Sequence, residues 1–190
     1  MSEPTATTAS IPTGFTAEVF EAFLQTRDEP EWVTERRREA FTLFQKLEGE
    51  ELDPEEWKRV PLRAFRPAKF QLQADPAAPS GLTTLMQDRA DFGGAVIHLD
   101  GHCLRQSISD TLAEKGVIFG NLCTVLRDHG DAIQPHFATR GVTAETDRFS
   151  AWHAAFWTGG TVLYVPRNVT VDEPLYSCLL YTSPSPRDTA

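Results

Sequence analysis

The sequence predicts an α+β protein, and three stretches carry that prediction. Apolar residues recur at helical spacing between residues 16 and 47. Asp100-Gly101 lies between two apolar runs, which is a strong β-hairpin signal. In residues 147–174 a helical repeat is followed by Gly159-Gly160 and then by short alternating strands that prolines interrupt. This last stretch is typical of a helix that leads into a β-solenoid.

A first amphipathic helix is expected from Thr16, a good N-cap residue, to about Arg27. Its buried stripe is supplied by Val19, Phe20, Phe23 and Leu24. Phe15 precedes the cap and is predicted to pack on Phe20 as a hydrophobic staple. Order is therefore expected to begin near residue 14.

A second, longer helix is expected to follow and to end near Leu47. Asp28 and Glu31 have the spacing of a capping box, and Pro30 would occupy the first turn, where a missing N–H costs little. Gly49 then ends the helix, and a short helical turn carrying Trp57 comes next.

The middle and end of the chain alternate strands with short helices. Ser109 and Asn121 are predicted to cap two of these helices, and apolar spacing predicts another helix up to Phe156. Predicted strands span residues 94–99, 102–108, 117–119 and 161–165, and Val169 with Val171 begins a further short alternation.

Composition and charge narrow the classes of function. No run approaches the roughly 20 apolar residues of a membrane helix, and the first 12 residues lack a secretory signal, so a cytoplasmic protein is expected. Residues 1–60 hold 14 acidic against 7 basic side chains, whereas residues 61–190 hold 13 against 11. The acidic excess in residues 1–60 argues against nucleic-acid binding and favours a basic protein partner.

The one cluster of possible metal ligands is formed by His98, His102 and Cys103 around the hairpin turn. A structural zinc site needs four convergent ligands, and nothing nearby in the sequence supplies the rest. Strand histidines without a metal are the simpler interpretation, and a small metal-dependent enzyme stays open as a third hypothesis. No nucleotide-binding loop and no nucleophile with an arranged base is present in the sequence. We therefore predict no catalytic, cofactor-binding or metal-binding residue and no enzyme activity.

Two blocks of sequence resemble a known family. Gly159-Gly160, a strand ending in Tyr164-Val165-Pro166 and a basic residue, and alternating valines before Glu173-Pro174 resemble the SufB/SufD proteins of iron–sulfur cluster assembly. Glu29-Pro30-Glu31-Trp32 and the arginine-rich helix after it are similar to the opening helices of that family. The resemblance covers roughly residues 14–175. Within the family, Glu55-Glu56-Trp57 followed by two basic residues is more similar to the SufD branch than to the SufB branch.

The resemblance implies a helical N-terminal domain followed by the start of a right-handed β-helix. It also implies a scaffold component that acts with SufB-like and SufC-like proteins, the latter an ATPase, while the complete complex handles an iron–sulfur cluster. The functional Cys and His residues of the family lie beyond Ser177, so none is assigned here and no cofactor is expected on this fragment. The alternative is a generic protein-interaction module with an acidic helical face and no enzyme activity.

Residues 178–188, CLLYTSPSPRD, match the translation of a common sequencing adapter, so we expect the genuine sequence to stop near Ser177. The β-helix would then be truncated, and the valines of residues 162–171 together with Leu163 would expose an apolar strand edge. The expected organisation is a disordered segment (1–13), a helical domain (14–72), a linker (73–81), a mixed α/β segment (82–144), the start of a truncated β-helix (145–177) and an adapter-derived tail (178–190).

Overall fold

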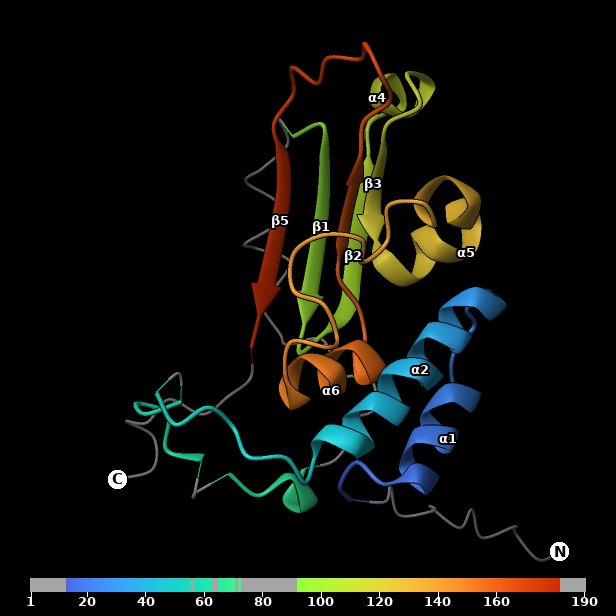
Figure 1. The fold of residues 1–190 in the computed structure, drawn as a ribbon. Coiled ribbons are helices and arrows are strands. Elements are labelled where there is room, and N and C mark those ends of the chain that lie inside the picture. The colour runs from blue at the N-terminus through green and yellow to red at the C-terminus, as the bar shows by residue number, and fades with distance from the viewer. Residues whose placement is uncertain (1–12, 56, 63–64, 71, 73–91, 182–190) are drawn as a thin grey trace, which may run out of the picture.

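The structure, a computed structural model, describes residues 13–55, 57–62, 65–70, 72 and 92–181. It is a mixed α and β fold with a helical layer at one end of a strand layer (Figure 1). The helical layer consists of α1 (Ala17–Gln25), α2 (Glu31–Leu47) and α6 (Arg148–Phe156). Most of residues 1–13, the predicted linker at 73–81 and the end of the tail lie outside the described residues.

Helix α1 forms as its sequence predicts. Thr16 has an extended backbone, and its hydroxyl accepts a hydrogen bond from the Val19 amide at 3.4 Å. The expected staple differs, however, because the Phe15 ring packs edge-on against Trp152 and Phe156, with ring centroids 4.3 and 5.1 Å away. The ring contacts of Phe15 are therefore made with helix α6, and not with Phe20 as the sequence predicts.

Helix α2 has the predicted length but not the predicted cap. Pro30 is its N-cap residue, and no side chain makes a capping hydrogen bond there, so the Asp28–Glu31 capping box is wrong. Asp28 instead lies 3.7 Å from the Arg127 guanidinium, which draws its carboxylate away from the helix end. The fixed φ of proline, here −56°, sets the entry to the helix without a polar cap.

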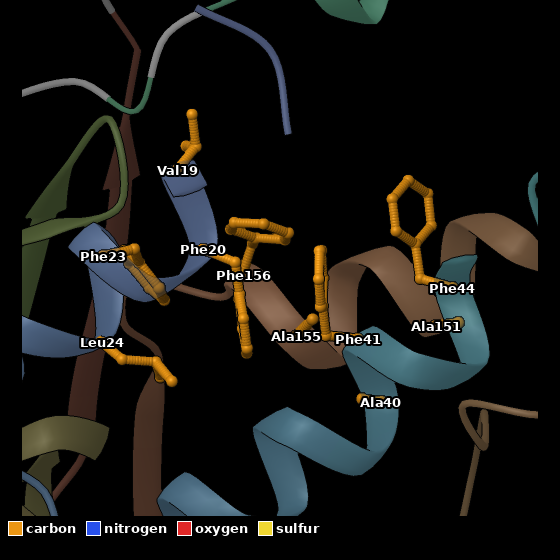
Figure 2. Close-up of a cluster of buried hydrophobic side chains, with 10 residues drawn as sticks. All are labelled: Val19, Phe20, Phe23, Leu24, Ala40, Phe41, Phe44, Ala151, Ala155 and Phe156. Carbon is orange, nitrogen blue, oxygen red and sulfur yellow. The ribbon is translucent and has the colours of Figure 1, made fainter. Parts of the chain in front are cut away.

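Helix α6 closes the core of the helical layer. Phe156 projects between α1 and α2 and contacts the rings of Phe20, Phe23 and Phe41 at centroid distances of 5.3 to 5.8 Å (Figure 2). Phe20 and Phe41 stack at 4.1 Å. The buried members of this cluster are Val19, Phe20, Phe23, Leu24, Ala40, Phe41, Phe44, Ala151, Ala155 and Phe156.

The predicted hairpin is confirmed. Strands β1 (Gly94–Leu99) and β2 (His102–Ile108) pair antiparallel, and Asp100 and Gly101 between them have φ of 48° and 86°. Two consecutive positive φ values match the turn geometry that suits the twist of a hairpin. Strand β5 (Leu175–Leu180) adds to the other side of β1 in parallel, which gives the order β2-β1-β5.

A second, two-stranded sheet is formed by β3 (Ile118–Asn121) and β4 (Thr161–Tyr164), paired antiparallel. Ser109 caps α4 (Asp110–Glu114) as predicted, accepting from the Leu112 amide at 3.4 Å. Helix α5 (Leu122–Ile133) follows β3 directly and bends at His129, and Asn121 is its N-cap residue but makes no side-chain capping hydrogen bond, so that predicted cap is wrong. Its residues Val125, Leu126 and Ile133 form a second core with Val33 of α2.

The segment after β4 departs from the prediction. Residues 165–174 form no strand, so the alternation assigned to Val169 and Val171 is wrong. The segment is held by other bonds: Ser109 donates to the Glu173 carboxylate at 3.2 Å, and the Gly93 amide donates to the Pro174 carbonyl at 3.0 Å. Pro166 follows β4 almost directly and Pro174 precedes β5, and each lacks the N–H that a strand ladder requires at its position. Strand β5 then runs on through Cys178, which pairs with Ile97.

The core of the helical layer joins residues from both ends of the chain, since α6 packs against α2. The domain bounds expected from the sequence stay a prediction, and so does the start of a β-helix. In the part of the chain that the structure describes, no helix is long and apolar enough to cross a membrane.

Candidate functional site

The hairpin turn carries the residues that the sequence singled out for metal binding. His98 on β1 is 1% exposed, and its Nε2 lies 3.3 Å from the Asn121 Oδ1. The register places His98 opposite Cys103, whose thiol donates to the Arg105 carbonyl at 3.5 Å. Burial raises the pKa of the Cys103 thiol, which disfavours the thiolate that a metal would require.

Among the described residues, no three His, Cys, Asp or Glu side chains lie close enough together to hold a metal ion. His98 bonds to an amide, while His102 is the residue opposite Leu99 in the hairpin. The structure therefore brings His98 and Cys103 together as strand partners but does not gather the ligand set that a metal centre needs.

The charged centre of the molecule lies between the two layers and was not predicted. Arg37 of α2 is 1% exposed, and its guanidinium makes two hydrogen bonds to the Glu29 carboxylate, at 2.7 and 2.8 Å. A third bond, 2.9 Å long, runs to the Ala155 carbonyl near the end of α6. The guanidinium also lies over the Trp157 ring, 3.5 Å from its centroid. Burial lowers the pKa of Arg37, while the Glu29 carboxylate acts in the opposite direction.

Residues 157–160, which we call the strap, lead from α6 to β4 and touch the hairpin turn. Thr158 donates from its hydroxyl to the Gly101 carbonyl at 3.3 Å. A Cβ at Gly159 would lie 2.6 Å from that same carbonyl oxygen, so only glycine allows this close approach. The strap therefore fills the narrow space between the helical layer and the sheet.

Cys123, the second residue of α5, also contacts the strap, at what we call the junction between the helical layer and the strand layer. Its thiol donates to the Thr158 carbonyl at 3.3 Å, and burial raises its pKa although the Arg27 and Arg37 guanidinium groups favour the thiolate. A thiol in this state is a weak nucleophile. Its role here is therefore packing and hydrogen bonding.

A groove of about 760 Å³ lies beside the junction. Its walls come from α2, the first residue of α5, residues 137–138 and 142–145, and α6, and Arg37 and Trp157 are among its lining residues. A smaller pocket of about 380 Å³ on another side of α6 is lined largely by aromatic rings, including Phe44, Phe149 and Trp152. Surfaces of this kind are suited to holding side chains of a partner.

One sequence signal could have revealed the buried charge. Arg37 stands in a run of three arginines that looks solvent-exposed, but it lies four residues after Val33 and four before Phe41, on the apolar stripe of α2. Its neighbour Arg38 points elsewhere and pairs with Glu21 at the surface, where both side chains are about half exposed. A cation on the buried stripe indicates an internal carboxylate partner.

Comparison with known proteins agrees with this architecture. Residues 18–176 match the model of the SufBD protein N-terminal region, a span that includes the three helices of the helical layer from residue 18 on, the hairpin and the strap, and that ends within β5. The chain belongs to the SufBD family of iron–sulfur cluster assembly proteins.

Within that family the chain is similar to SufD. It is 39% identical to the iron–sulfur cluster assembly protein SufD of Bacillus subtilis over 84 residues, which cover 44% of this chain and 18% of that protein. It is 24% identical over 173 residues to a SufBD family protein of Staphylococcus haemolyticus, and 27% over 183 residues to one of Staphylococcus epidermidis. In both cases the match covers 85% of this chain and 37% of the relative.

Proposed function

We propose that this chain is the N-terminal part of a SufD-like scaffold component that acts in iron–sulfur cluster assembly with SufB-like and SufC-like proteins in the cytoplasm. The observation that carries the proposal is the length of the family match, because residues 18–176 include the helical layer, the hairpin and the strap together. A match to one short motif would not have linked these elements.

The proposal assigns the chain a structural role and not a catalytic one. Three side chains near the junction make structural bonds: Glu29 pairs with Arg37, the His98 Nε2 lies 3.3 Å from the Asn121 Oδ1, and the Cys123 thiol donates to a carbonyl. Burial also raises the pKa of the Cys123 thiol, which disfavours the nucleophilic thiolate and supports a structural role. We further propose that this part of the protein binds no cofactor and that the iron–sulfur cluster is handled by other parts of the complex.

The start of a β-helix belongs to the same proposal. Parallel pairing of β1 with β5 supports it, because each strand in a β-helix pairs in parallel with the strand of the next coil. Strand β5 is also the last strand of its sheet among those described, so its outer edge is where a further coil would be added.

The test compares this chain with the complete protein from the same source, each produced together with SufB-like and SufC-like partners. We expect the complete protein to co-purify with both and to raise ATP hydrolysis by the SufC-like protein. Reconstitution with iron and sulfide should give a cluster, seen by visible absorption and Mössbauer spectroscopy. The 190-residue chain should not raise ATP turnover. A monomer of this chain that binds the SufC-like protein and stimulates it would contradict the assignment of that role to other segments.

A generic interaction module is the competing function, and the groove of about 760 Å³ beside α2 and α6 favours it. The same experiment separates the two hypotheses. If the complete protein co-purifies with neither the SufB-like nor the SufC-like protein, the interaction module is the better explanation.

A further inference from the structure

We propose that the strap couples the helical layer to the strand layer, and that the Arg37–Glu29 pair locks it, so that both layers open as one cooperative unit. This inference concerns how the fold is held together, and it stands whether or not the chain serves in cluster assembly. The Arg37–Glu29 pair lies where α2, the loop between α1 and α2, and the end of α6 meet.

The lock joins segments that are far apart in the sequence. Glu29 belongs to the loop between α1 and α2, Arg37 to α2, and the Ala155 carbonyl to the last turn of α6. Because the guanidinium bonds two of these partners and stacks on Trp157, its position fixes where α6 ends and where the strap starts. A guanidinium has its donors in a rigid fork, which restricts all these partners at once.

The strap connects the end of α6, which Arg37 holds, to the hairpin turn of the sheet. Thr158 uses its hydroxyl to hold the Gly101 carbonyl and its own carbonyl to accept from Cys123. Gly159 adds a backbone contact with Gly101 on the same side. Residue 158 therefore links the β1–β2 turn with the start of α5, and Ala155, whose carbonyl accepts from Arg37, lies three residues before it in the sequence.

Beyond the strap, side chains continue the connection into both sheets. The Asn121 Oδ1 faces His98 of β1, while the Asn121 amide donates to the Gln106 side chain of β2 at 2.8 Å. Asn121 is the last residue of β3, so it joins the two-stranded sheet to the three-stranded sheet. The Leu122 amide donates to the Gly160 carbonyl of the strap at 2.8 Å, so these hydrogen bonds and the covalent chain between them connect α2 through the strap to β2.

Cys123 offers a direct measure of whether the strap is closed. Its thiol is partly buried beneath the Thr158 carbonyl, so alkylation requires the strap to move away. Cys103→Ser and Cys178→Ser leave Cys123 as the only thiol of the chain. Labelling with N-ethylmaleimide, followed by mass spectrometry, then reports opening of the strap.

In that background we expect Arg37→Met to raise the labelling rate of Cys123 on the order of a hundredfold, because the buried Glu29 carboxylate loses both hydrogen bonds from Arg37 and keeps only Arg27, 3.8 Å away. Arg38→Met is the matched control, since Arg38 is the next residue, also pairs with a glutamate, and is about half exposed. The control should label like the parent. Equal rates for Arg37→Met and Arg38→Met would overturn the lock.

Glu29→Gln decides the question if Arg37→Met does not fold, because the amide keeps the shape of the side chain and removes only its charge. An increase in labelling of tenfold or so supports the lock, whereas an unchanged rate in a folded Glu29→Gln protein rejects it. Native-state hydrogen exchange tests the coupling itself. Peptides from α2 and from β1–β2 should exchange with one shared opening free energy in the parent, and two distinct values would show that the layers open independently.

Discussion

The helical layer and the strand layer differ in how completely they cover their own apolar surface. Phe20 and Phe41 of the helical layer are 2% and 7% exposed, whereas Leu163 of β4 and Leu179 of β5 are 53% and 57% exposed. A helix satisfies its backbone hydrogen bonds internally and needs a partner only for one face, but a strand at the edge of a sheet also leaves a row of backbone groups unpaired. The helical layer is therefore closed with three helices, while the strand layer keeps edges that further chain could extend.

Two neighbouring arginines of α2 show how burial changes the contribution of an ion pair. Inside the junction, Arg37 and Glu29 are both about 1% exposed and make a two-point hydrogen-bonded pair. At the surface, Arg38 of α2 and Glu21 of α1 are both about half exposed. Exposed pairs contribute roughly 0 to 1 kcal/mol, but removing one partner of a buried pair costs about 3 to 5 kcal/mol. Burial, and not the presence of a pair, decides which arginine matters for stability.

The largest effect that separates the layers is expected from Phe41→Ala. The Phe41 ring is buried against Phe20 and Phe156, so its loss leaves a cavity in the closed core. We expect the free energy of unfolding to fall by about 3 to 5 kcal/mol in urea titration. Leu163→Ala on the exposed strand edge should change it by less than about 0.5 kcal/mol. Similar losses for both substitutions would show that the strand edge is covered in solution.

A smaller effect is expected at the contact between the layers. Gly101 has φ of 86°, and a Cβ there would collide with the Thr158 side chain, so Gly101→Ala combines backbone strain with a clash. We expect a loss of about 1 to 3 kcal/mol. Gly49→Ala is the matched control, because a Cβ at Gly49 meets nothing within 4 Å. That variant should be neutral or more stable by up to about 1 kcal/mol.

The helix caps provide a third comparison, with a loss of about 1 kcal/mol expected for Thr16→Ala. Thr16 accepts a hydrogen bond from the Val19 amide, whereas Asp28 makes no cap for α2. Asp28→Ala should therefore change the free energy of unfolding by less than about 0.5 kcal/mol. Thermal unfolding followed by circular dichroism measures both. A loss at Asp28 as large as that at Thr16 would restore the capping box that the sequence suggested.

The smallest effect on folding stability, within about 0.5 kcal/mol, is expected from Leu163→Lys and Leu179→Lys. Their effect should be on association, because a lysine on an edge strand opposes pairing between copies of the chain. Light scattering of concentrated samples should show less aggregate for both variants. Val142→Lys introduces the same charge at a residue that is 77% exposed and outside any strand. If it lowers aggregation equally, net charge and not the strand edge is responsible.

Local patterns in the sequence were sufficient for most of the secondary structure. The bounds of α1, α2, the hairpin and α6 follow from apolar spacing, a Thr cap and the Asp100-Gly101 turn, all of which act within a few residues. The family resemblance could be recognised for the same reason, and the match ends at residue 176, close to where the sequence stops resembling the family. Cys178 to Leu180 nevertheless extend β5, because an apolar segment next to an open strand can continue its ladder whatever its origin.

What the sequence alone determined about this protein is its set of helices, its hairpin and its family, because each depends on neighbouring residues. Tertiary structure decided which arginine of three is buried, and it turned the Asn121 side chain toward His98 instead of the start of α5. It also placed α6 in the helical core and β5 beside β1. These outcomes depend on contacts between residues far apart in the sequence, such as Arg37 with the Ala155 carbonyl, and no local pattern specifies which distant partner satisfies a buried charge or an open strand.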